Sequence, residues 1–125
     1  MTRAEFKKWL KALRSKKYQQ GEDRLRNSDN MFCCLGVYLD AVKKVEWKKQ
    51  HSQECYSYMG KNSDLPDKIV KGSFYSSTGD PKPAFLSELY SLADLNDGGH
   101  TFEAIADILE KNTEEYVIIR DKVKK

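Results

Sequence analysis

The run Phe32–Leu39, with the sequence FCCLGVYL, constrains the fold more than any other feature of the chain. It is the most apolar stretch, and apolar residues continue to Val45 with a spacing closer to the helical period of 3.6 than to the strand period of two. We therefore predict a strand that leads into a buried helix from about Cys33 to Trp47. Gly36 inside a helix costs about 1 kcal/mol relative to alanine, so it indicates that another backbone packs closely there.

The N-terminal segment has the pattern of an amphipathic helix. Thr2 and Glu5 have the T-x-x-E spacing of a capping box, which satisfies open amides at a helix start. Apolar residues at intervals of three and four predict one buried face: Phe6, Trp9, Leu10 and Leu13. Basic residues fill the opposite face: Lys7, Lys8, Lys11 and Arg14.

Weaker patterns predict the remaining elements. Residues 25–32 have the pattern of a short hairpin, and Pro66 suits the first position of a helical turn that carries Ile69 and Val70. Two further amphipathic helices are predicted, one through residues 86–93 and one through residues 102–109, with a glycine-rich turn between them.

Three segments have no clear pattern. The apolar pattern weakens over residues 47–60, although a helix that persisted there would put His51 and Cys55 on one face. Residues 71–83, rich in Ser, Gly and Pro, are predicted to be a flexible loop. The tail from residue 113 to residue 125 is open to two interpretations, because Tyr116–Ile119 favours a strand whereas Thr113 and the glutamates after it favour a helix start.

Length and composition set the fold class. A chain of 125 residues is of ordinary size for one domain, and 39% hydrophobic residues can build its core. The 33% of charged residues exclude a membrane span, and lysines interrupt the apolar residues at the N-terminus, so no signal peptide is predicted. We expect a single compact α+β domain over residues 1–125, with helices packed around a small antiparallel sheet or hairpin. We also expect a cytoplasmic location with reduced cysteines.

The positive charge is concentrated near the N-terminus. The net charge is only +3, but the first 26 residues are rich in Lys and Arg and contain just three acids: Glu5, Glu22 and Asp23. A basic patch of this kind binds nucleic acid or an acidic protein surface, or is simply a solvated helix face. Exposed aromatics beside lysines stack on bases or enter a partner's pocket, or else cover the core beneath loops. The candidate partner-binding residues are Lys7, Lys8, Lys11, Arg14, Lys48, Lys49, Tyr56, Tyr58, Phe74 and Tyr75.

The sequence contains none of the common catalytic motifs. It lacks G-x-x-x-x-G-K, G-x-G-x-x-G, G-x-S-x-G and H-E-x-x-H, which mark many nucleotide-binding enzymes and hydrolases. Cys34 and His100 are the conceivable nucleophile and base, but thiols in an apolar run are usually inert core residues. We therefore predict that the protein is not an enzyme and takes no small-molecule substrate.

The cysteines and histidines also suggest a metal site. His51 and Cys55 are four residues apart, so on a helix both side chains reach one tetrahedral zinc ion. The candidate ligands are Cys33, His51, Cys55 and His100, with Cys34 able to replace Cys33. Four protein ligands would make the zinc structural. The spacing is not a CxxC pair, so buried or incidental thiols remain the alternative.

Several short stretches fit one larger pattern: Trp9-Leu10, Ala12-Leu13, Gly21, Phe32–Val37, Leu65-Pro66, Leu92–Gly98, Phe102, Ile105, Ala106 and Glu110. With these stretches the chain resembles a family of small phage and prophage proteins, most of which have no assigned function. The resemblance spans about residues 6–110. Its two sharp parts are the F-C-C-L-G-V run and the L-N-D-G turn with its F-x-x-I-A helix.

The resemblance implies a function by association. Small cytosolic phage proteins without catalytic motifs are often counter-defence factors, and anti-CRISPR proteins are single domains that occupy a surface of their target. The implied function is stoichiometric inhibition of a bacterial defence nuclease such as Cas9, by blocking target DNA loading or a conformational step. A chain of net charge +3 does not mimic DNA, so the expected contact is an acidic protein face or the guide RNA backbone. The alternative is a small zinc-stabilised nucleic-acid-binding module.

Overall fold

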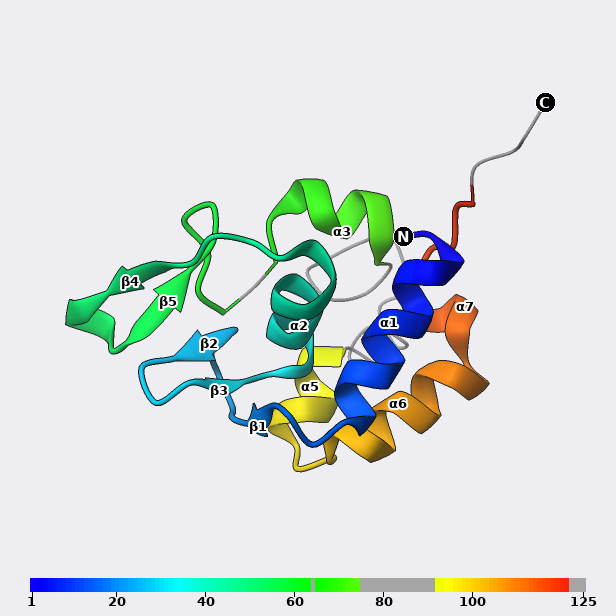
Figure 1. Ribbon diagram of the computed structural model, residues 1–125, viewed down its shortest axis with the longest axis horizontal. Coiled ribbons are helices and arrows are strands. Elements are labelled where there is room, and N and C mark those ends of the chain that lie inside the picture. Colours follow the sequence, from blue (N-terminus) through cyan, green and yellow to red (C-terminus); the bar gives the residue numbers. More distant parts are fainter. Residues whose placement is uncertain (64, 75–91, 122–125) are drawn as a thin grey trace.

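Helices form one end of the molecule and a small sheet forms the other (Figure 1). This computed structural model describes residues 1–63, 65–74 and 92–121. The helices are α1 (Arg3–Arg14), α2 (Cys34–Val37), α3 (Asp67–Ser73), α5 (Leu92–Asp97), α6 (Phe102–Lys111) and α7 (Thr113–Tyr116), with a π-helix η1 (Tyr38–Lys43) and a 3-10 helix η2 (His51–Gln53). The strands are β1 (Gln19–Gln20), β2 (Arg26–Asn27), β3 (Met31–Phe32), β4 (Lys48–Gln50) and β5 (Cys55–Ser57). The predicted α+β class of a single compact domain is confirmed.

Helix α1 forms as its sequence pattern predicts. The hydroxyl of Thr2 accepts a hydrogen bond from the amide of Glu5 at 3.1 Å, and the Glu5 carboxylate accepts one from the amide of Thr2 at 2.9 Å. This completes the capping box. The four predicted apolar residues are buried: Phe6, Trp9, Leu10 and Leu13. Their face packs against η1 and α6, which leaves the lysine side of α1 facing solvent.

The five strands form a mixed sheet in the order β1-β3-β2-β5-β4. The hairpin predicted over residues 25–32 is confirmed by the antiparallel pair β2 and β3. The helix predicted from Cys33 to Trp47 is shorter than expected. Helix α2 passes directly into the wider turns of η1, whose last residue is Lys43 and whose C-cap is Lys44. Lys44 adopts a left-handed conformation with φ of 52°, and this stops the helix before Val45.

Residues 47–60 form a second hairpin. Strands β4 and β5 pair antiparallel, with η2 between them, and Glu54 turns the chain in a left-handed conformation with φ of 52°. The possible helix that would have aligned His51 with Cys55 does not form. Strand pairing with β2 outweighs the weak local helical pattern here.

Gly36 lies against the backbone of Leu25, as the sequence predicted. A Cβ atom at Gly36 would lie 1.8 Å from the Leu25 carbonyl oxygen. The same carbonyl accepts a hydrogen bond from the amide of Cys33 at 3.3 Å. This contact holds the start of α2 directly against the segment that enters β2.

Trp9 is the centre of the buried aromatic core. Its ring packs edge-to-face on Tyr38 and on Phe74, with centroid distances of 5.4 Å in both pairs. Its indole N–H donates to the Cys34 carbonyl at 3.0 Å, which satisfies the buried polar atom. Phe74 is 0% exposed, so the prediction that it contacts a partner is wrong: it ends α3 and completes the aromatic core. Tyr75 lies outside the described residues.

The remaining predictions concern the segments around α3 and the tail. Helix α3 confirms the helical turn after Pro66, with this proline at the cap position. It extends to Ser73, so the first residues of the expected loop 71–83 are helical, and residues 75–83 lie outside the described part. In the tail, α7 forms, and Val117 then bridges Phe74. Thus the tail starts as a helix and turns extended at Val117.

Asn96 joins three separate parts of the fold. Its side chain is 1% exposed, and its oxygen accepts hydrogen bonds from the Gln20 side chain at 2.9 Å and from the Cys34 amide at 3.2 Å. Its nitrogen donates to the Gly21 carbonyl at 2.8 Å. The sequence marked this position only as part of a turn. Asn96 instead ties α5 to β1 and to the start of α2.

Among the described residues, no helix has both the length and the apolar character that crossing a membrane requires.

We expect Gly36→Ala to lower the free energy of unfolding by about 3 kcal/mol or more, because the new methyl group would overlap the Leu25 carbonyl. The control is Gly72→Ala in α3, where an added Cβ meets no atom within 4 Å. This control should leave stability unchanged or raise it by up to about 1 kcal/mol. Urea unfolding followed by circular dichroism measures both, and equal stability of the two variants would contradict the packing argument.

We expect Asn96→Ala to lower the free energy of unfolding by about 2–4 kcal/mol, because it removes the side-chain partner of the buried Gly21 carbonyl and the buried Cys34 amide. Asn112→Ala is the matched control, since Asn112 is exposed and its side chain makes one hydrogen bond, to Ile108. Its cost should stay below about 1 kcal/mol. The same unfolding measurement compares the two, and a cost for Asn96→Ala as small as that of the control would count against its role.

Candidate interaction surface

A groove with a volume of about 410 Å³ runs between α1 and η1. Small side chains leave room in it, chiefly Ala12 of α1 and Ala41 of η1. The residues that line it are Lys8, Lys11, Ala12, Ser15, Lys17, Tyr18, Asp40, Ala41 and Lys44. Four of these nine are lysines, contributed by α1, by the segment after it and by the residue that ends η1. We call these four lysines the groove lysines.

The groove lysines are exposed and make no ion pair with any carboxylate in the described ranges. Two other basic residues of these helices, Arg14 and Lys43, are already engaged. Arg14 reaches Asp107 and Glu110 of α6, both at 2.8 Å, and Lys43 reaches Glu5 at 3.0 Å. Arg14, one of the expected partner-binding residues, therefore links α1 to α6. The groove lysines therefore contribute uncompensated positive charge to this region.

Asp40 organises the inner side of the groove. Its carboxylate accepts a hydrogen bond from the Tyr18 hydroxyl at 2.7 Å and another from the Trp47 indole N–H at 3.0 Å. Burial, and then the hydrogen bond to Asp40, raise the pKa of Tyr18 well above its usual value. Tyr18 therefore stays neutral and keeps donating, and the two rings are held in place by one carboxylate.

A row of cationic and aromatic side chains crosses the sheet next to this groove. Lys49 pairs with Tyr56, Tyr56 with Arg26, and Arg26 with Phe32, so the four side chains share one face. The Arg26 guanidinium lies 4.1 Å from the Tyr56 ring centroid, and the Lys49 ammonium lies 5.7 Å from it. Both distances fit cation–π contacts. We call Lys49, Tyr56 and Arg26 the cation–aromatic row.

Side-chain contacts through the buried Phe32 link the groove to the cation–aromatic row. Tyr18, which lines the groove, packs edge-to-face on Phe32 at 5.0 Å, and Phe32 packs on Trp47 at 6.3 Å. Arg26 lies over both Phe32 and Trp47, at 5.4 Å and 5.9 Å from the ring centroids. These contacts connect Tyr18 of the groove to Arg26 of the row.

The other expected partner-binding residues lie around this surface. Lys7 is exposed on α1 outside the groove, and Lys48 pairs with Ser57, which places it on the opposite face of the sheet from Tyr56. Tyr58 is half-buried after β5 and bridges Lys61. Four further residues of this surface were not predicted from the sequence: Lys17, Tyr18, Arg26 and Lys44. Only the pairing of distant segments brings these four to one surface, although Arg26 and Lys17 belong to the basic N-terminal region seen in the sequence.

The expected zinc ligands occupy separate places. The sulfur of Cys33 accepts a hydrogen bond from the Gly36 amide at 3.4 Å, and the Cys55 thiol lies 3.6 Å from the Gln50 side-chain oxygen. His51 is exposed in η2, and His100 is exposed with its Nδ1 atom 3.2 Å from the Leu95 carbonyl. No group of three His, Cys, Asp or Glu residues within the described ranges is arranged to hold a metal ion.

The thiols of Cys33 and Cys34 are buried, and their environment favours the protonated, unreactive form. Burial raises the pKa of Cys33 to about 11 and raises that of Cys34 well above its usual value. The Cys34 thiol also lies 3.6 Å from the Leu92 carbonyl. A thiol that stays protonated inside the core is a poor nucleophile, which counts against a catalytic pair of Cys34 and His100.

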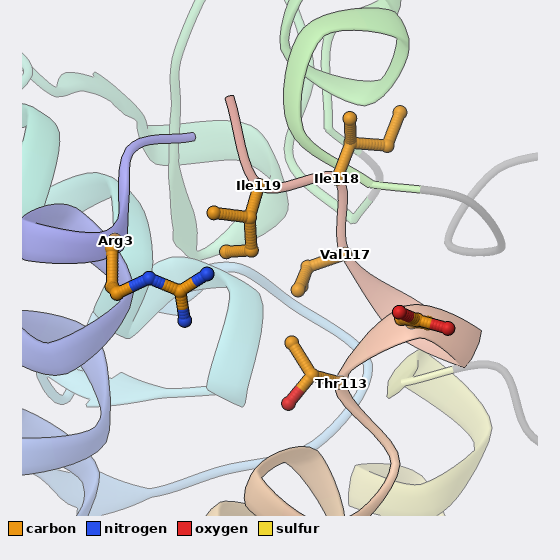
Figure 2. A pocket seen from close by; sticks show the side chains of 6 residues that line it. Arg3, Thr113, Val117, Ile118 and Ile119 are labelled. Carbon is orange, nitrogen blue, oxygen red and sulfur yellow. The ribbon is translucent and has the colours of Figure 1, made fainter. Parts of the chain in front are cut away.

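A second hollow, of about 570 Å³, lies beside the N-terminus, where the Arg3 side chain extends toward Thr113 and Val117 (Figure 2). Its charged group is already engaged, because Arg3 pairs with Asp121 at 3.6 Å. Nearby, the ammonium group of Met1 donates to the Ile118 carbonyl at 2.8 Å. The polar groups around this hollow thus serve to fasten the C-terminal segment.

Comparison with known proteins identifies one family. The family described as a domain of unknown function (DUF8296) matches residues 1–113. No curated protein and no solved structure matches the chain. The matched range includes α1, the sheet and every residue of the groove and of the cation–aromatic row.

We expect Cys33 and Cys34 to react with iodoacetamide at pH 8 about 100-fold or more slowly in the folded protein than in denaturant, because a pKa near 11 leaves little thiolate. Mass spectrometry of the alkylated peptides measures each thiol. Met59→Cys provides an exposed thiol as a positive control, since Met59 is 61% exposed. Labelling of Cys34 in the native protein as fast as that of the control would revive a role as nucleophile.

Proposed function

The chain belongs to the family of the domain of unknown function DUF8296, and we propose that it is a binding protein that inhibits a larger effector by occupying its surface. The resemblance to small phage proteins gives this proposal its specific form. The effector would be a bacterial defence nuclease such as Cas9, bound at a ratio of one to one. The protein would then be an anti-CRISPR type of counter-defence factor, and it would transform no substrate.

The observation that supports this proposal best is the set of unpaired groove lysines. Where the fold needs a charged link, it forms one, as between Arg14 and Glu110 or between Lys43 and Glu5. Four ammonium groups line a groove whose described residues include a single carboxylate, Asp40, and none of the four forms an ion pair within the described ranges. Each of them repels the others, so an anionic partner that enters the groove relieves this repulsion.

The scaffold around the groove suits inhibition by obstruction. Buried side chains of α1, such as Trp9 and Leu13, fix one wall, and η1 with its buried Leu39 fixes the other. Binding through a preformed surface costs little conformational entropy. We infer that the bound protein blocks target DNA loading or a domain movement of the effector by steric means.

A nucleic-acid-binding module is the second candidate function. The cation–aromatic row favours it, because bases stack on arginine and tyrosine side chains. The zinc that the sequence analysis attached to this alternative finds no group of ligands among the described residues. In the first candidate function the protein binds a nuclease complex. In this second one it binds nucleic acid alone, without any effector protein.

We expect the purified protein to inhibit DNA cleavage by Cas9 loaded with guide RNA, with full inhibition near one molecule per complex. Lys8→Glu with Lys17→Glu should weaken inhibition about 10-fold or more, because two attractive charges become repulsive. Lys68→Glu with Lys111→Glu is the control: it changes the charge equally, at exposed positions outside the groove.

Three results would contradict the proposal. One is full inhibition by a small fraction of a molecule per complex, which would indicate turnover. Another is an equal effect of the two double variants, which would remove the groove from the interface. The third is a lack of inhibition across a panel of bacterial defence nucleases that includes Cas9.

A further inference from the structure

We infer that the groove and the cation–aromatic row together bind a single-stranded nucleic acid, with its phosphates along the groove lysines and its bases against the row. This inference rests on the proposed function and names the part of the effector that the protein touches. The contact would be an exposed single strand, such as an unpaired segment of a guide RNA, and not an acidic face of the effector protein.

The first argument is the arrangement of the groove lysines. Lys8 and Lys11 are three residues apart and therefore share one face of α1. Lys44 approaches from the end of η1, so ammonium groups lie along both walls of the groove. A sugar-phosphate chain that follows the groove passes between these walls and meets lysines in succession.

The second argument is that Arg26 is held in a fixed position on the sheet. Its Nε and Nη2 atoms donate to the side-chain oxygen of Asn30 at 3.0 Å and 2.7 Å. Its guanidinium also lies 4.1 Å from the Tyr56 ring centroid. A flat, cationic group fixed beside an aromatic ring is a surface on which bases stack, and this stacking tolerates any base sequence.

The third argument is the direct continuity of the two features. The Tyr18 ring belongs to the groove and also contacts Phe32, which lies beneath Arg26. A strand leaving the groove toward the row therefore passes Tyr18 and Asp40, and Asp40 is a carboxylate whose oxygens accept hydrogen bonds from Tyr18 and Trp47. A single strand uses both features, because its phosphates pair with the lysines while its bases stack on the side chains of the row.

Among the described residues, Asp40 is the one carboxylate that lines the groove, and it does not reverse this balance. Both of its oxygens accept hydrogen bonds, one from Tyr18 and one from Trp47. These two hydrogen-bond donors reduce the negative electrostatic potential of the Asp40 carboxylate, and so its repulsion of a phosphate. Four lysines against one carboxylate leave the groove with a net charge of +3.

The experiment measures binding of fluorescein-labelled 12-nucleotide strands, rU12 and dT12, by fluorescence anisotropy at 50 mM to 200 mM salt. We expect binding whose log–log salt slope is about −3, as four phosphate contacts on a single strand would give. Comparison of rU12 with dT12 separates an RNA source from a DNA source of the strand.

Variants separate the two parts of the surface. Lys8→Glu with Lys17→Glu should weaken binding at least 10-fold and flatten the salt slope, whereas Lys68→Glu with Lys111→Glu should not. Tyr56→Leu should weaken binding about 5-fold or more with an unchanged salt slope, because it removes stacking and no charge. Lys49→Ala, at an exposed position, tests the row if Tyr56→Leu impairs folding.

The outcomes distinguish this inference from the proposed function. No binding of either strand at 50 mM salt, together with equal affinity for Cas9 with and without guide RNA, overturns the inference and leaves the inhibitor proposal standing. Binding of polyglutamate as tight as that of rU12 overturns it in favour of an acidic protein partner. Strand binding without inhibition of any nuclease supports the inference and overturns the proposed function.

Discussion

The contact between Gly36 and the Leu25 carbonyl is the constraint on which the rest of the structure depends. A helix can lie this close to another backbone only where one residue has no side chain. The contact fixes α2 against the entrance to β2, and so joins the sheet to the helical end of the molecule. Helix α2 passes directly into η1, and Asp40 of η1 accepts hydrogen bonds from Tyr18 and Trp47.

The location of the charged residues matters more in this protein than the net charge of +3. Exposed ion pairs such as that between Arg14 and Asp107 contribute about 0–1 kcal/mol each, so they orient helices more than they stabilise them. These ion pairs have a larger effect on the surface charge, because they neutralise Arg14 and Lys43. Because the acids of α6 and Glu5 engage the flanking basic residues, the groove lysines are left as the concentrated positive region. The aromatic rings beside them add a second kind of recognition, which depends on shape and stacking.

The predictions that held concern interactions between residues close in sequence. The capping box of Thr2 and Glu5 and the buried stripe of α1 need only a few neighbouring residues, so the pattern predicted both. The predictions that failed needed distant partners. The β4–β5 hairpin replaced the possible helix that would have aligned His51 and Cys55, because β5 pairs with β2, and Phe74 was buried because Trp9 lies beside it. A local sequence pattern cannot predict such contacts between distant segments.

By itself, the sequence determined the helical faces, the hairpin at residues 25–32, the close backbone approach at Gly36 and the excess of lysines near the N-terminus. Periodicity, turn chemistry and the lack of a side chain at Gly36 act over a few residues and need no knowledge of the fold. Only the tertiary structure decided which lysines stay unpaired, and it alone placed Arg26 beside Tyr56 and Lys17 beside Lys44. Those arrangements depend on how segments far apart in the chain pack, because a charge is free or compensated only in relation to its neighbours in space.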